Sequence, residues 1–423
     1  MRPVYVVGSH STTFGKKPDT SFKELTRETY LGVLADSEQE DGRLVEFIYF
    51  GNSAMHGVKQ GTIRGQACTV ELVDEGLIWP RTPTINVEGA CATGSMAFHS
   101  AWKDVASGAS QLAVAIGVEK LFLPKATSDP TAKKAMMRGF MNGVDNFDVP
   151  RLIAAYESAA ASIGATFKPE EGRSIFMDTY AVQALLHMDR YGTTQRQLAV
   201  AAAKAHTYGA QNPLAQYRFE MTVDDVLADR EITFPLTRAM CAPIGDGAAS
   251  AVLCSEEVLE TLPSRVQRRA VRIAASVLTG GYYRSIDEPS LSAVAATRAY
   301  ERANVGPEDV DVVELHDATS FSEIYQLEML GFASPGGGGP LVESGATGLG
   351  GRLPVNTSGG LVSKGHPVGA TGLSMIYELV TQLRGEAGSR QVPNAAVGLQ
   401  ENGGGVIGLE EAACSVIILE RLR

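Results

Sequence analysis

Apolar strand-like runs alternate with helical patterns along the start of the chain, and this alternation limits the possible folds more than any other feature. Short continuous apolar runs predict buried strands, and apolar residues three and four apart predict helices. The predicted elements are a strand at Val4–Gly8, a helix at about Ser21–Asp36, a strand at Val45–Tyr49, a helix at Gly61–Glu75, an extended run at Pro83–Val87, a helix to about Ala106 and a strand at Leu112–Gly117. Such a succession is typical of a layered α/β sheet.

The same order of elements returns in the last third of the chain, without a visible residue-level repeat. The predicted elements are strands at Val271–Leu278 and Val310–Leu315, helices at Leu291–Ala303, Phe321–Leu330 and Ala370–Leu383, and strands at Ala395–Leu399 and Ala413–Leu419. We therefore expect two similar layered halves, residues 1–265 and 266–423, joined by the arginine-rich connector Ser264–Arg269.

A segment of different character, about residues 122–234, separates strands of the first half. It is rich in Met, Lys and Arg, and helices are predicted at Ala155–Ile163, Phe176–Tyr191 and Gln195–His206. Long insertions at the strand ends of α/β folds commonly form substrate sites. Met137, Arg138 and Met141 are candidate substrate contacts, although ordinary core packing explains the methionines at least as well.

Composition excludes several classes of function. The 423 residues carry a net charge of −11, which disfavours nucleic-acid binding, and no apolar run is long enough to span a membrane. The N-terminus lacks a signal-peptide layout. Five cysteines without CxxC spacing argue against a disulfide framework or a zinc site, so we expect no metal and a reducing cytoplasm.

Cys91 lies in a turn of small residues, Gly89-Ala90-Cys91-Ala92-Thr93-Gly94, between the extended run and a helix. The first turn of a helix favours a thiolate, because orphan N–H groups and the helix dipole stabilise negative charge. An isolated cysteine is more often a small packed residue. The reactive interpretation therefore depends on partners elsewhere in the chain.

Two histidine motifs and a glycine run supply such partners. His316 precedes Asp317 at the end of a predicted strand, and His366 lies in the loop Lys364-Gly365-His366-Pro367-Val368-Gly369-Ala370-Thr371-Gly372. A lone histidine means little, but glycines around His366 allow another backbone to approach closely. The run Glu401-Asn402-Gly403-Gly404-Gly405 follows a strand, where it provides N–H groups for an oxyanion or a tight hairpin.

These four motifs, in this order, resemble those of the thiolase superfamily over essentially the whole chain, and His316-Asp317 resembles the sterol-carrier-protein (SCP2) type branch. The resemblance implies a five-layer αβαβα fold with a helical loop domain, a homodimer, and acyl-CoA and free coenzyme A as substrates. It implies that Cys91 takes the acyl group, that His366 deprotonates Cys91, and that His366 and His316 bind the thioester oxyanion. The N–H groups of Cys91 and Gly403 form the second oxyanion hole by the same resemblance.

The chain departs from the family pattern at two positions, each of which can carry a second cysteine that acts as acid and base. Glu401 occupies the position of the second cysteine of classical thiolases, and Ala318 that of the cysteine often found after His-Asp. Glu401 either takes over the proton transfer, with a pKa raised by burial, or is a structural carboxylate that accepts backbone hydrogen bonds. The residues leave both interpretations open.

The Glu-Asn-Gly-Gly-Gly ending resembles a subgroup that works with a small separate zinc-ribbon/OB-fold subunit. That subgroup includes archaeal acetoacetyl-CoA thiolases and the thiolase that cleaves benzoylsuccinyl-CoA to benzoyl-CoA and succinyl-CoA in anaerobic toluene degradation. The N-terminal sequence and residues 136–141 favour the latter substrate. The alternatives are acetoacetyl-CoA cleavage, a condensing enzyme of the ketoacyl-synthase or hydroxymethylglutaryl-CoA-synthase type, and a non-catalytic acyl-CoA-binding scaffold.

Overall fold

The computed structural model describes residues 2–122, 143–170 and 173–422. Its helices are α1 Phe22–Asp36, α2 Arg64–Asp74, α3 Thr93–Ser107, α5 Val149–Ala161, α6 Ile175–Tyr191, α7 Gln195–Gln211, α8 Val223–Ala228, α9 Glu256–Leu259, α10 Ser264–Arg269, α11 Leu291–Ala303, α12 Ser320–Met329, α13 Gly338–Glu343 and α14 Val368–Arg384. Its strands are β1 Val4–Ser11, β2 Phe47–Gly51, β3 Thr84–Val87, β4 Leu112–Glu119, β5 Glu231–Thr233, β6 Leu236–Thr237, β7 Gly247–Ser255, β8 Val271–Gly280, β9 Val312–Glu314, β10 Val397–Gly404 and β11 Ala413–Arg421.

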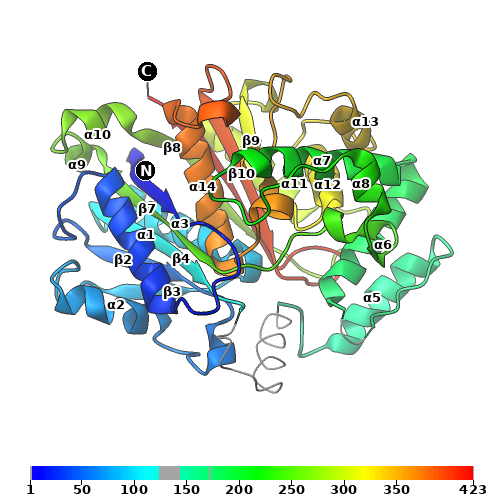
Figure 1. Cartoon of the computed structure of the whole chain (residues 1–423), viewed down its shortest axis with the longest axis horizontal. Coiled ribbons are helices and arrows are strands. Elements are labelled where there is room, and N and C mark those ends of the chain that lie inside the picture. The colour runs from blue at the N-terminus through cyan, green and yellow to red at the C-terminus, as the bar shows by residue number, and fades with distance from the viewer. Residues whose placement is uncertain (1, 123–142, 171–172, 423) are drawn as a thin grey trace.

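The two halves share the order of their inner strands, and β3 is an additional edge strand of the first half. Counted from the centre of the sheet, the first half runs β1-β7-β4-β2-β3 and the second runs β8-β11-β10-β9, so each begins with its first strand and continues with its last. A short antiparallel pairing of β1 with β8, Tyr5 to Arg272 and Val6 to Val271, joins them. The predicted repetition of element order is thereby confirmed, and Figure 1 shows the first half in blue and cyan beside the second in yellow to red.

Three large apolar cores lie between the five layers, the middle one covering both faces of the central helical layer. Side chains alternate across each strand, so Val4 and Val6 face one core while Tyr5 and Val7 face another. The middle core holds α3 and α14 between the strands of the two halves. The outer cores pack α1 and α2 on the first half, and α11 and α12 on the second, where α6 and α7 join them. The predicted five-layer α/β fold is confirmed.

The contact between α3 and α14 requires glycine. A Cβ atom on Gly94 would lie 2.9 Å from the Leu373 nitrogen, and one on Gly372 would lie 2.4 Å from the Ser95 nitrogen. These distances are shorter than real Cβ contacts, so the two backbones approach closely only because side chains are absent. The entries to both helices, and the residues immediately before them, are therefore held side by side.

Several predicted boundaries were wrong for identifiable reasons. The connector 264–269 is the short helix α10. The glycine run does not follow its strand, because β10 continues through Gly404 and pairs Gly403 with Cys414. Ladder hydrogen bonds to β11 compensate for the weak strand propensity of glycine there.

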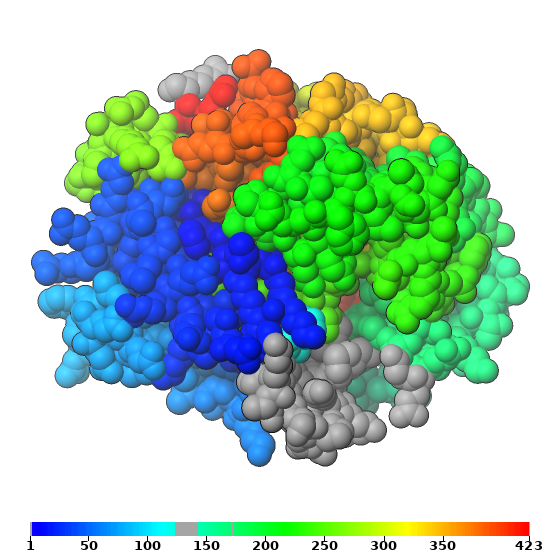
Figure 2. Space-filling model, in the orientation of Figure 1, coloured from blue at the N-terminus to red at the C-terminus, as the bar shows by residue number. Residues whose placement is uncertain are grey.

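The segment between β4 and β7 contains α5 to α8 and the hairpin β5–β6. It packs against the second half, where α7 contacts α12, α13 and the turn Gly360–Lys364. In Figure 2 the green surface of its later helices adjoins the blue surface of the first half. The predicted helices in this segment are confirmed, with α5 beginning at Val149 rather than at Ala155. Its limits as a domain, and the division of the chain near residue 265, stay predictions.

Candidate active site

Cys91 lies in a strained turn between β3 and α3. Ala90 adopts a left-handed backbone with φ of +49°, and residues 90–92 form a single 3₁₀ turn before α3 begins at Thr93. A left-handed alanine costs about 1–2 kcal/mol. Hydrogen bonds hold it: the Ala90 N–H donates to Glu88 Oε1 at 2.6 Å, and the Thr93 hydroxyl donates to the Ala90 carbonyl at 2.6 Å. Cys91 is only partly buried in this turn.

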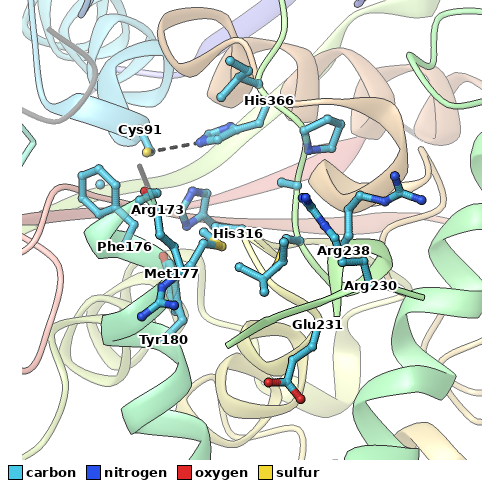
Figure 3. A pocket seen from close by; sticks show the side chains of 18 of the residues that line it. Cys91, Arg173, Phe176, Met177, Tyr180, Arg230, Glu231, Arg238, His316 and His366 are labelled. Atoms are coloured by element: carbon cyan, nitrogen blue, oxygen red, sulfur yellow. Dashed lines mark hydrogen bonds between the residues drawn. The ribbon is translucent and has the colours of Figure 1, made fainter. Parts of the chain in front are cut away.

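His366 enters from the other half, directly before α14. A π-type turn at Gly360–Lys364 and Gly365 with φ of +106° reverse the chain, and the His366 N–H donates to the Pro243 carbonyl at 3.0 Å. The ring is buried, with 5% of the residue exposed. Its Nε2 atom lies 3.2 Å from Cys91 Sγ, as the dashed line in Figure 3 shows.

Thr371 determines which nitrogen of His366 carries the proton. Its hydroxyl donates to the Pro367 carbonyl at 3.1 Å, and His366 Nδ1 lies 2.8 Å from the same oxygen. Because the one hydroxyl proton is already used, the oxygen accepts from an Nδ1–H. The Nε2 lone pair is then left to accept the Cys91 S–H. The sequence showed Thr371 within the His366 motif, but its role was missed.

Burial keeps both reacting groups neutral at rest. Burial, with smaller contributions from Glu411, Glu119 and Glu88, raises the pKa of Cys91 to about 12, and the facing Gly405 N–H opposes part of that rise. Burial, with smaller contributions from His316 and Lys364, holds the pKa of His366 well below its usual range. Burial therefore outweighs the stabilisation of a thiolate that was expected near the start of a helix, because an apolar site disfavours charge.

His316 lies beside this pair. Its ring centre is 5.3 Å from that of His366, and burial lowers its pKa to about 4. Neither ring nitrogen has a hydrogen-bond partner among residues 2–122, 143–170 and 173–422. Potential ligand atoms of Cys91, His316 and His366 all lie within 4.8 Å of one another. The structure thus brings three of the predicted residues together in the lining of one cavity, as Figure 3 shows.

Glu401 is not part of this cluster. Gln400 and Asn402 point toward Ser95 of α3, so the intervening Glu401 points to the opposite face of β10. There Glu401 Oε2 accepts the His316 backbone N–H at 3.2 Å, and Oε1 contacts the Ser292 hydroxyl and the Cys414 thiol. Burial raises its pKa to about 8. The contacts match a structural carboxylate rather than a proton shuttle facing the substrate.

Gly403 is likewise set back from the sulfur. Gly403 pairs with Cys414 of β11, whereas Gly404 and Gly405 line the cavity and the Gly405 N–H faces Cys91. Within the glycine run, the N–H group nearest the sulfur is thus that of Gly405, two residues after the expected Gly403. The shift follows from the continuation of β10 through Gly404.

A cavity of about 490 Å³ opens in front of Cys91. Its far wall comes from α6, β5 and the residues after β6, as Figure 3 shows. Its lining includes Phe176, Met177, Tyr180, Arg173, Arg230, Glu231, Arg238, Cys241 and Ile244. Sequence reasoning missed these residues, although two aromatic residues in the first turns of a predicted helix were an available signal. Met137, Arg138 and Met141 lie outside the described residues.

Among the helices in the described ranges, none is both long and apolar enough to cross a bilayer.

Two family descriptions match the chain: "Thiolase, N-terminal domain" over residues 4–234 and "Thiolase C-terminal domain-like" over residues 260–421. An acetyl-CoA acetyltransferase of Methanothermobacter thermautotrophicus is 36% identical over 96% of this chain and 98% of its own. Rabbit sterol carrier protein 2 is 34% identical, covering 97% of this chain and 73% of its own. The benzoylsuccinyl-CoA thiolase subunit BbsB of Thauera aromatica is 31% identical over 92% of this chain and 91% of its own.

Solved structures agree on the fold. The "Ltp2-ChsH2(DUF35) aldolase" superposes with a TM-score of 0.75 at 22% identity, over 99% of this chain and 98% of that one. An acetyl-CoA acetyltransferase from Syntrophomonas wolfei superposes with a TM-score of 0.67 at 17% identity, over 100% and 99% of the two chains.

The two matched domains define the class of protein to which the chain belongs, the acyltransferases. Within this class the chain belongs to the thiolase family. It is therefore an acyl-CoA C-acyltransferase.

Proposed function

We propose that this chain cleaves a 3-ketoacyl-CoA by thiolysis, with Cys91 as the nucleophile that takes the acyl group. The observation that carries the proposal is the 3.2 Å contact between Cys91 Sγ and His366 Nε2, with the opposite nitrogen of His366 bound to Thr371. That arrangement removes the thiol proton at the moment of attack, which is the requirement for a cysteine nucleophile of high pKa.

His366 accounts for both proton transfers of the first step. It accepts the Cys91 proton as the sulfur attacks the keto carbon, and it returns that proton to the carbanion released when the carbon–carbon bond breaks. No second thiol is then needed, and Glu401 is assigned as a residue that positions His316. In the second step free coenzyme A attacks the acyl-enzyme, its thiol proton goes to His366, and His366 passes that proton to the departing Cys91 thiolate.

Two sets of donors stabilise the oxyanions. His316 and His366 serve the thioester oxygen of the substrate, as the unused ring nitrogens of His316 support. The Cys91 N–H and the glycine run serve the oxygen on the carbon that Cys91 attacks. Gly405 fits this second role better than Gly403, because its N–H faces the sulfur.

Benzoylsuccinyl-CoA is the proposed substrate. Phe176, Tyr180 and Ile244 provide an apolar wall for an aromatic acyl group. Arg173 is paired with Asp178 and Glu170, whereas the exposed Arg230 guanidinium has no hydrogen bond to any described residue and is suited to a free carboxylate. The likeness to BbsB supports this choice. Acetoacetyl-CoA is the second candidate, supported by the likeness to the archaeal acetyltransferase.

The proposal includes a homodimer and a small zinc-ribbon/OB-fold subunit. β3 is the outer strand of its half, and its Ile85 is 43% exposed, so a second copy can pair along this edge. A structural relative is titled as Ltp2 with ChsH2(DUF35), and another as a thiolase in complex with coenzyme A. A reducing cytoplasm suits a free catalytic thiol and completes the proposal.

Thiolysis of benzoylsuccinyl-CoA and acetoacetyl-CoA, followed by mass spectrometry of the CoA products, tests the proposal. The protein is assayed alone and with its zinc-ribbon subunit. Benzoyl-CoA and succinyl-CoA from wild type, none from Cys91→Ala, and a loss in Arg230→Ala confined to the carboxylated substrate would support it. Cleavage of acetoacetyl-CoA alone selects the second candidate. No cleavage of either substrate would favour a condensing enzyme or a scaffold.

A further inference from the structure

The three side chains at the cavity floor come from three separate parts of the chain. Cys91 precedes α3, His316 follows β9, and His366 precedes α14. Across the described ranges, they form the one cluster of three thiol, imidazole or carboxylate groups whose geometry could hold a metal ion. We propose that this cluster binds a soft divalent cation such as Zn²⁺, and that the bound ion inhibits acyl transfer.

The distances suit a small tetrahedral ion. A zinc ion with bonds of about 2.0–2.3 Å to nitrogen and sulfur separates its ligand atoms by about 3.3–3.6 Å. Cys91 Sγ and His366 Nε2 are already 3.2 Å apart, and no pair in the cluster exceeds 4.8 Å. His316 supplies the remaining adjustment, since neither of its ring nitrogens is held by a hydrogen bond among the described residues.

The surroundings of His366 resemble those of a metal ligand. Metal-binding histidines commonly donate the other ring N–H to an oxygen, which fixes the ring and exposes the coordinating lone pair. The Thr371 hydroxyl accepts the His366 Nδ1–H in this way, at 2.8 Å. The ion would thus meet a lone pair that already points at Cys91 Sγ.

The ligand types select the ion. One thiolate and two imidazoles favour Zn²⁺ and its analogue Co²⁺ over Mg²⁺ or Ca²⁺, which prefer oxygen ligands. The cavity leaves the fourth position for water or a solute. Binding displaces the S–H proton, forms an S–metal bond and occupies the His366 lone pair. Each of these changes removes a group that thiolysis needs, so metal and acyl group exclude each other.

Cobalt binding provides a readout that does not depend on turnover. One equivalent of Co²⁺ added to the metal-free protein should produce a sulfur-to-cobalt charge-transfer band in the near ultraviolet. The band should be absent in Cys91→Ala and in protein alkylated at Cys91. His316→Gln should weaken Co²⁺ binding by at least about tenfold, the scale of losing even a supporting contact. One equivalent of Zn²⁺ should also stop thiolysis, and a chelator should restore it.

Cys241 is the matched control, because it is the other thiol that lines this cavity. Its Sγ atom contacts the Thr237 carbonyl at 3.4 Å and is outside the cluster. Cys241→Ser should leave the cobalt band unchanged. A band that survives in Cys91→Ala, a band lost in Cys241→Ser, no band with wild type, or activity that rises with Zn²⁺ would each overturn the proposal. Circular dichroism of every variant confirms that it is folded.

Discussion

The two halves of the molecule share the order of their inner strands, but different turns and side chains precede their central helices, α3 and α14. Before α3, the first half has a single 3₁₀ turn in which Cys91 is partly exposed to the cavity. Before α14, the second half has a π-type turn and a buried His366 bound to Thr371. One scaffold therefore holds a partly exposed thiol and a buried imidazole fixed by a hydrogen bond.

In the proposed mechanism, acyl transfer is divided between the halves. Cys91 belongs to one half and His366 to the other, and the helices that follow them, α3 and α14, touch through glycines. Catalysis should therefore be more sensitive to the fit between the halves than to any single surface residue. The following predictions test this division, from the largest expected effect to the smallest.

Removing the His366 imidazole should inactivate the protein while leaving the structure around Cys91 intact. His366→Ala should lower kcat by about a thousandfold, within the range for loss of a general base. It should also abolish rapid labelling of Cys91 by iodoacetamide, because burial holds the pKa of that thiol at about 12 and nothing then accepts its proton. Steady-state kinetics and labelling followed by mass spectrometry measure both effects. Rapid labelling in the variant would contradict the division.

Moving α3 away from α14 should lower activity nearly as much. In Gly94→Ala the new methyl group would meet the Leu373 nitrogen and the Gly369 carbonyl at 2.9 and 3.1 Å. We expect about a hundredfold loss of kcat/KM from misplacement and about 1–3 kcal/mol lower free energy of unfolding. Kinetics and urea denaturation measure these. Gly280→Ala, where a Cβ meets nothing within 4 Å, is the control and should change stability by less than about 0.5 kcal/mol. Equal effects in both variants would refute the argument.

Removing the hydrogen bond between His366 and Thr371 should have a smaller effect on kcat. Thr371→Val removes the oxygen that accepts the His366 Nδ1–H. Because one neutral hydrogen bond contributes about 0.5–1.5 kcal/mol, kcat should fall by about two- to tenfold. Thr371→Ser keeps the hydroxyl and should restore most of the rate. If valine and serine behaved alike, the threonine would matter for packing and not for the tautomer.

Glu401 should contribute least to the rate. Glu401→Gln keeps an oxygen for the His316 N–H, so kcat should change by less than about threefold, an energy below about 0.7 kcal/mol. A loss of a hundredfold would instead make Glu401 a proton shuttle.

The stability of the same variant should respond differently to pH. The pKa of Glu401 rises from 4.5 to about 8 on folding, so its favourable contribution is fully present below pH 4.5 and is lost as pH rises toward 8. Glutamine removes that dependence. Urea denaturation at pH 5 and pH 8 should show a smaller decrease in stability for Glu401→Gln than for wild type. An identical decrease in both proteins would contradict the raised pKa.

The sequence predicted the elements better than the groups that complete the site. Apolar periodicity located α11 to the residue and showed that the halves repeat, and the motifs identified Cys91, His316 and His366. Periodicity did not show that β10 continues through the glycines, because only pairing with β11 compensates for their flexibility. It also did not show which face of β10 Glu401 occupies, since that depends on the register of the strand.

The cavity wall depended on contacts between distant segments. Phe176 and Tyr180 face Cys91 only because the inserted helices pack against the second half. No local pattern specifies that packing. The sequence also did not show which tautomer His366 adopts. That depends on the Thr371 hydroxyl, which lies next to the His366 ring only once α14 has formed.

Trapping the acyl-enzyme tests the central claim most directly. Wild type, His366→Ala and Cys241→Ser are mixed with acyl-CoA substrate without free coenzyme A, quenched, and mapped by peptide mass spectrometry. We predict one acyl group on Cys91 in wild type and in Cys241→Ser, and almost none in His366→Ala. An acyl group on Cys241, or undiminished acylation of Cys91 without His366, would contradict an active site divided between the two halves.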